Sequence, residues 1–133
     1  MKRDMDLVRS ILLTIESQPD SKPIPFLQVE GYDSETVAYH CEIMYQNGLL
    51  LHFSGQKVGI GEYGFWEVSG ITWEGYDYLD KIRDNTIWDK TKAAIKKKGL
   101  PLVIDTIKTV STAFITASTE GLADAILKSG GII

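Results

Sequence analysis

A chain of 133 residues, 44% of them hydrophobic and 24% charged, can bury a real core in one ordinary domain with a helical appendage, which argues against intrinsic disorder. Its formal net charge of −4 disfavours general binding to nucleic acids or anionic membranes. The single cysteine, Cys41, allows no internal disulfide. Residues 1–10 carry acids where a signal peptide needs an apolar run, and no stretch reaches the ~18 apolar residues of a membrane span, so we expect a cytoplasmic protein.

The N-terminal segment predicts a helix and then a short strand. Asp4 or Asp6 can begin the helix. Its apolar stripe comprises Leu7, Val8, Ile11, Leu12 and Ile15. Apolar and polar side chains then alternate over residues 24–32, which predicts a strand, and the prolines at 23 and 25 restrict it to a sheet edge. A standard helix-turn-helix domain would place a helix here instead.

Residues 33–51 predict a capped amphipathic helix that runs into a strand. Ser34 is the expected N-cap, and Asn47 and Gly48 end the helix because both tolerate the left-handed conformation. Its apolar face comprises Val37, Ala38, Cys41, Met44 and Tyr45.

A β-hairpin is expected next, with strands at residues 49–53 and 65–71 and a glycine-rich connection at 54–64. The connection contains GIGEYG (59–64), which matches the G-x-G-x-x-G of dinucleotide-binding folds. That function requires a helix after the motif, whereas a strand follows here. We therefore interpret the motif as the loop of a hairpin.

The C-terminal half predicts further helices. Thr72 can cap one helix, and Thr86 begins a capping-box pattern whose helix runs to Lys98 and stops at Gly99. Residues 81–98 hold seven bases and two acids. The two expected domains are residues 1–84 and residues 85–133.

Pro101 suits the first turn of a last helix, which Thr119 and Gly121 are expected to interrupt. Its apolar seam comprises Val103, Ile107, Val110, Phe114 and Ala117. This seam predicts either packing on the domain's own core or a homodimer contact through Val103, Ile107, Val110 and Phe114.

The pattern T-V-x-x-H in the central helix, followed by a methionine and then G-L-L, resembles the way the recognition helix of winged helix-turn-helix repressors meets its wing. The resemblance implies an α+β fold. We expect a winged-helix-like domain (helix, edge strand, helix, β-hairpin wing, helix) followed by C-terminal helices.

Three separated motifs carry a second resemblance: MKRDMDLVRSILLTIE, the GY-x-x-E-x-V-x-Y-H segment, and ITWEGYDYLDKIRDNTIWDK. Together they resemble domain-of-unknown-function family 2513, over about residues 1–98. The family occurs mainly in bacteria and their phages and prophages. The resemblance implies a small winged-helix-like cytoplasmic protein of a mobile element and carries over no catalytic residue.

The central helix lacks the charges that a DNA-reading helix uses. Between Lys22 and Lys57 there is no Lys or Arg. The acids in that interval are Glu30, Asp33, Glu35 and Glu42. Since affinity for duplex DNA comes largely from cations that release counterions, this segment predicts weak phosphate binding.

The sequence offers no convincing catalytic or metal site. Cys41 is the candidate nucleophile, with His40 and His52 as candidate bases. His40 and Cys41 are adjacent and would point about 100° apart on a helix, so they cannot form a nucleophile–base pair. We expect Cys41 to be a buried small hydrophobe and His40 to bridge the central helix and the first strand. We predict a protein that is not an enzyme and that uses no metal or cofactor.

Two functional hypotheses remain. The first is a protein-interaction module of phage or prophage type, acting on an unidentified protein partner. Its predicted contact residues are Tyr32, Glu35, Tyr39, His40, Glu42, Tyr45 and Gln46. The alternative is a DNA-binding transcriptional regulator that uses the hairpin and the helix spanning Lys81–Lys98. Its predicted contacts are Lys57, Lys92, Lys96, Lys97 and Lys98.

Overall fold

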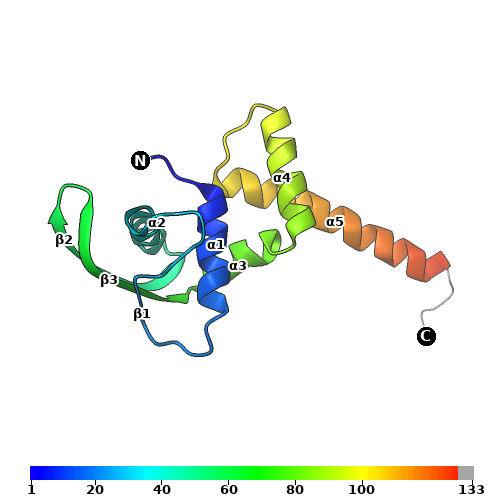
Figure 1. The fold of residues 1–133 in the computed structure, drawn as a ribbon. Coiled ribbons are helices and arrows are strands. Elements are labelled where there is room, and N and C mark those ends of the chain that lie inside the picture. The colour runs from blue at the N-terminus through cyan, green and yellow to red at the C-terminus, as the bar shows by residue number, and fades with distance from the viewer. Residues whose placement is uncertain (129–133) are drawn as a thin grey trace. The chain divides into compact units, whose positions relative to one another are not determined.

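The computed structural model describes residues 1–128 and confirms an α+β fold with a three-stranded antiparallel sheet. The chain divides into two compact units, Met1–Leu79 and a second unit that begins at Asp80. The elements are α1 (Met5–Glu16), β1 (Ile24–Pro25), α2 (Ser34–Gln46), β2 (Leu50–Gly59), β3 (Glu62–Ile71), α3 (Trp73–Ile82), α4 (Asn85–Lys97) and α5 (Ile104–Lys128) (Figure 1). The winged-helix assignment and the boundary after residue 84 stay predictions.

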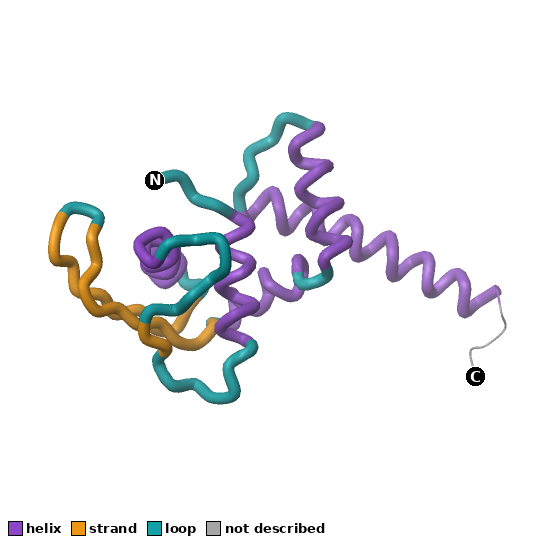
Figure 2. Tube along the Cα trace, in the orientation of Figure 1, coloured by secondary structure: helices purple, strands orange, loops and turns teal. Residues whose placement is uncertain are grey.

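The expected first strand is much shorter than predicted. Only Ile24 and Pro25 pair with β3, opposite Val68 and Glu67. At Phe26 the backbone turns to a φ of 48°, so the rest of residues 24–32 leaves the sheet as the long loop between β1 and α2 (Figure 2). Pro25 explains part of this correction, because it has no N–H to continue a ladder.

The hairpin is longer than predicted. β2 and β3 extend through most of the glycine-rich connection, leaving a turn at residues 60–61. GIGEYG therefore forms the hairpin tip, with no helix after it, which confirms the hairpin interpretation. The pairing of β2 with β3 shifts register twice, between Gly55 and Lys57 and between Lys57 and Gly59.

The core of the first unit is formed where α1, α2 and the sheet meet (Figure 1). Asp4 caps α1, as predicted, by accepting the N–H of Leu7. Asp33, and not Ser34, caps α2, and its carboxylate accepts the N–H of Thr36. The side chain of Ser34 instead accepts the indole N–H of Trp66 on β3, at 3.2 Å.

The start of α3 is fastened to the end of α2. The Thr72 hydroxyl accepts the N–H of Gly75 at 2.9 Å, which confirms Thr72 as the cap. The same hydroxyl donates to the carbonyl of Gly48, and the Thr72 N–H donates to the carbonyl of Leu49. This brings the backbone of α3 so close to the α2–β2 turn that a Cβ atom on Gly75 would overlap the Leu49 carbonyl oxygen.

The second unit contains α4 and α5, which pack on each other. Asp84 caps α4 by accepting the N–H of Ile87, so the capping box predicted at Thr86 is wrong by two residues. α5 begins at Ile104, after Pro101. Among the described residues no helix is both long and apolar enough to cross a membrane.

The interruption predicted in α5 is also wrong, because one helix continues to Lys128. The Thr119 hydroxyl donates to the carbonyl of Ile115, a bond compatible with the helix, and a glycine such as Gly121 costs a helix only about 1 kcal/mol. Of the predicted seam, Ile107 is buried, and Val103, Val110 and Phe114 are partly exposed. The homodimer stays a prediction.

Substitution of Gly75 by alanine should destabilise the protein by about 1–3 kcal/mol, because the added methyl displaces either α3 or the carbonyl of Leu49. The matched control is Gly121→Ala on α5, where nothing lies within 4 Å of the added carbon. That change should stabilise by roughly 0.5–1 kcal/mol through helix propensity. Urea denaturation measures both free energies, and equal effects would contradict the close approach.

Substitution of Tyr78 by phenylalanine should leave the protein equally stable or stabilise it by about 1 kcal/mol. The Tyr78 hydroxyl is buried and has no hydrogen-bond partner within the described chain. Burial raises the pKa of this phenol, so above pH 10 the unfolded chain releases a proton that the folded chain retains. Stability is then lost as pH rises, and denaturation from pH 9 to 11 should show a smaller loss in the variant.

Candidate functional site

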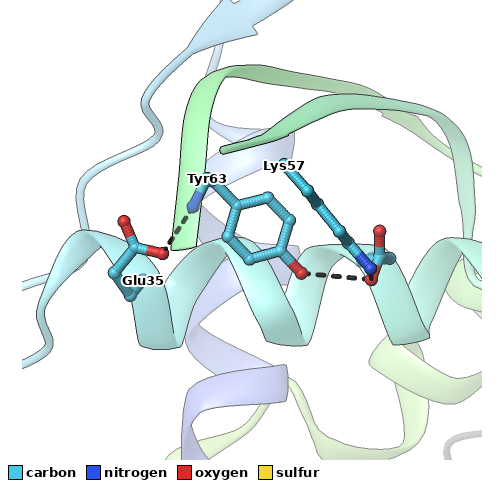
Figure 3. Close-up of polar contacts among 4 residues, drawn as sticks. Glu35, Lys57 and Tyr63 are labelled. Carbon is cyan, nitrogen blue, oxygen red and sulfur yellow. Dashed lines mark hydrogen bonds and ion pairs between the residues drawn. The ribbon is translucent and has the colours of Figure 1, made fainter. Parts of the chain in front are cut away.

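The outward face of α2 is covered by the chain's own hairpin. Glu35 and Glu42 lie about two turns apart on α2. The hairpin contributes Lys57 from β2 and Tyr63 from β3 (Figure 3). These four residues form a connected set of polar contacts, which we call the latch. The latch unites the two acids predicted to bind a protein partner with the lysine predicted to bind DNA.

Tyr63 makes two contacts to α2. Its backbone N–H donates to Glu35 Oε2 at 2.9 Å, and its hydroxyl donates to Glu42 Oε1 at 3.1 Å. The Glu35 carboxylate thus satisfies a backbone N–H on β3. Burial, together with the hydrogen bond to Glu42, raises the pKa of the Tyr63 phenol well above 10, so the hydroxyl keeps the proton it donates.

Lys57 completes the latch. Its Nζ lies 3.2 Å from Glu42 Oε1 and 5.8 Å from the centre of the Tyr63 ring. The side chain of Glu42 is only 18% exposed, whereas that of Lys57 is 60% exposed. One carboxylate oxygen therefore receives both the phenol and the ammonium, and the positive charge of Lys57 is compensated inside the chain.

A hollow of about 190 Å³ opens beside the latch, which we call the acidic hollow. It is lined by Met1, Glu35, Tyr39, Glu42, Lys57, Gly61, Glu62 and Tyr63. Three carboxylates and two phenol rings line it, together with a single basic side chain, Lys57. This surface can receive a cation or a hydrogen-bond donor, and it repels phosphate.

His40 lies inside the protein and not on a contact surface. It is fully buried, accepts the N–H of Asp4 at Nε2 (2.9 Å), and lies with Nδ1 2.8 Å from the Thr36 carbonyl. Since a carbonyl can only accept, Nδ1 carries the proton and the imidazole is neutral. His40 therefore joins α2 to the start of α1, and the predicted bridge to the first strand is wrong.

Tyr32 takes part in the same connection. Its hydroxyl donates to Asp4 Oδ2 at 2.8 Å, and burial together with that carboxylate raises the pKa of Tyr32 to about 12. Asp4 thus caps α1 and binds both Tyr32 and His40. These two predicted contact residues hold α1, α2 and the preceding loop together.

The candidate catalytic residues make separate contacts. Cys41 is fully buried, and burial raises the pKa of its thiol to about 12, which keeps it protonated and unreactive at neutral pH. His52 lies with Nε2 3.2 Å from Glu67 across the β2–β3 pair. Within residues 1–128 no three His, Cys, Asp or Glu side chains are close enough to hold a metal ion.

Two predicted contact residues remain open to solvent at the end of α2. Tyr45 is 44% exposed, and Gln46 beside it is also exposed. The structure adds Leu51 on β2 and Trp73 and Tyr76 on α3, which the sequence interpretation missed, and Trp73 is 80% exposed. Because Thr72 fastens α3 to the α2–β2 turn, we group Tyr45, Leu51, Trp73 and Tyr76 as the turn patch.

The other predicted DNA contacts lie in the second unit. The Nζ of Lys92 lies 5.2 Å from the centre of the Trp88 ring on the same helix. Lys96 and Lys97 are exposed in the last turn of α4, and Lys98 is its exposed C-cap. Cations there complement the negative end of the helix dipole.

Substitution of His40 by alanine should destabilise the protein by about 2–4 kcal/mol, because it leaves a cavity and removes the acceptor of the Asp4 N–H. The control, His52→Ala, removes a partly exposed imidazole and should change stability by less than about 0.5 kcal/mol. Chemical denaturation compares the two. An equal loss in both variants would contradict the structural role of His40.

Comparison with known proteins identifies the family. The family described as "Hypothetical protein (DUF2513)" matches residues 2–101. An uncharacterized protein of Haemophilus influenzae strain Rd is 40% identical over 124 residues, covering 87% of this chain and 97% of that protein. No solved structure matches the chain. The match to the family extends over most of the chain and ends before α5, and on this evidence the chain belongs to domain-of-unknown-function family 2513.

Proposed function

We propose that this protein is a non-enzymatic protein-interaction module, of the phage or prophage type that the family resemblance implies, and that its first unit carries the docking surface. The observation that supports this most directly is the 3.2 Å contact between Lys57 and Glu42. The cation that the hairpin would offer to a DNA phosphate is already compensated. The α2 face beneath it presents carboxylates.

The charge of the whole region agrees with this proposal. Residues 23–80 hold nine acidic side chains and a single basic one, Lys57. Such a segment repels the DNA backbone at long range. With a single basic side chain to neutralise phosphates, it would release few counterions from DNA and gain little affinity that way. A protein partner with basic groups is the complementary ligand.

The turn patch supplies apolar anchors for such a partner. Exposed aromatic side chains are the residues most enriched in protein interfaces, and Trp73 is the most exposed aromatic ring in the described chain. Tyr45 and Gln46 extend the patch along α2. The turn patch thus offers apolar groups to a partner, and the acidic hollow offers ionic groups.

DNA binding remains the second candidate, because Lys96, Lys97 and Lys98 form an exposed basic group at the end of α4. This contact would use phosphates alone and would be weak and insensitive to DNA sequence. A homodimer through the partly exposed seam of α5 would present two such basic groups to one duplex and so bind it more tightly than a monomer.

A site-specific photo-crosslinker distinguishes the two candidates. With the crosslinking amino acid at Trp73 or Tyr45, we expect adducts with one protein species from cells of the source organism. The matched control carries the crosslinker at Gln18, which is exposed in the loop after α1. In the same preparations, duplex DNA should give no gel shift at 50 mM salt.

The opposite pattern would overturn the proposal. A salt-sensitive gel shift, lost on reversal of the charges of Lys96, Lys97 and Lys98, would identify a DNA-binding protein if the crosslinker at Trp73 also yields no specific adduct. The ionic strength must be fixed, because nucleic-acid affinities depend on it steeply.

A further inference from the structure

We propose that the distal hairpin, residues 54–63, is an autoinhibitory strap, and that its Lys57 occupies the position that a basic side chain of the protein partner takes when the strap opens. This inference rests on the proposed function for the identity of the ligand. The opening of the strap itself can be measured without any ligand.

The strap is attached to α2 by polar contacts. Every residue from 54 to 62 is exposed, including Val58 and Ile60 at the tip. By contrast, the base of the hairpin is anchored by Trp66 and Val68, which are buried. A segment without buried apolar side chains opens at a lower free energy than the core on which it rests.

The pairing inside the hairpin is also weakest at the strap. The two register shifts bracket Lys57, and bulges of this kind leave residues out of the ladder. Gly55, Gly59 and Gly61 lie in the same stretch. The strap can therefore bend near Gly55 while the ladder between Leu50 and Ile71 stays paired.

The latch closes the strap with contacts of moderate strength. The Lys57 side chain is mostly exposed, and exposed ion pairs stabilise little because water and salt screen them. The stronger contact is the Tyr63 hydroxyl on Glu42, an oxygen it shares with Lys57. A closed strap that opens in a small fraction of molecules is the expected equilibrium.

The chemistry of the uncovered surface decides the ligand. Lys57 already places an ammonium group on a carboxylate and near a phenol ring, and among the described residues that line the acidic hollow it is the one basic side chain. Removing it leaves Glu35, Glu42 and Glu62 there without a basic side chain beside them. An arginine or lysine of a partner restores that charge, in competition with Lys57.

The first measurement is native-state amide exchange on the ligand-free chain. In Tyr63→Phe the amides of residues 54–63 should exchange about tenfold faster, since the latch has lost one hydrogen bond to a charged group. Tyr45→Phe is the control, because it removes an exposed phenol from α2, outside the latch. If these amides exchange only on global unfolding, and equally in both variants, the strap is overturned.

The second measurement is binding of a synthetic decapeptide of alternating arginine and glycine, with the glutamate–glycine peptide as a control. Lys57→Met should bind the basic peptide about threefold to tenfold more tightly than the wild type, and Glu42→Gln about tenfold more weakly. Lys96→Met removes the same charge from α4 and should bind like the wild type.

The outcomes separate this inference from the proposed function. Equal affinity of Lys57→Met and Lys96→Met would overturn autoinhibition, even if the strap opens. If the basic peptide binds none of the variants, the inference that the ligand is basic is wrong. Either result leaves crosslinking at Trp73 as an independent test of protein interaction.

Discussion

A single carboxylate, that of Glu42, determines what the hairpin of this protein can do. Its Oε1 receives the phenol of Tyr63 and the ammonium of Lys57, so the hairpin is held down on α2 and its cation is compensated by the same atom. In a DNA-binding protein the tip of such a hairpin and the exposed face of such a helix must both be open to phosphate. Here the Lys57 ammonium and the Glu42 carboxylate lie 3.2 Å apart, so each compensates the charge of the other.

The scaffold beneath the latch depends on polar contacts of a different kind. His40 and Tyr32 both reach Asp4, which also caps α1, so three segments meet at one residue. These side chains are polar and aromatic, and in a sequence they have the features of contact residues. Inside the fold they satisfy buried backbone and carboxylate groups, which would otherwise cost free energy.

The sequence predicted the order of elements well, because helices and hairpins are signalled locally. The Thr72 cap and the stop at Gly48 follow from the conformations that single residues prefer. The details that were predicted wrongly are those that depend on contacts with residues elsewhere in the fold. Asp33 caps α2 in place of Ser34, because the Ser34 hydroxyl accepts a hydrogen bond from Trp66, a residue distant in sequence. The strand after Pro25 ended because its chain turned back at Phe26.

The candidate site was predicted only in part, for a related reason. A sequence gives the total charge of a segment, but it does not show which charges the fold compensates internally. The sequence assigned Glu35 and Glu42 to one hypothesis and Lys57 to the other, and the structure places all three in one latch. Their roles in binding a partner or DNA stay predictions. The structure also exposes large apolar side chains, Leu51 and Trp73 above all. The sequence did not show their exposure, because it depends on how α3 joins the α2–β2 turn. In the function that we propose, a protein partner would meet two surfaces of unequal accessibility: apolar anchors that are open to solvent, and carboxylates that the hairpin must first release.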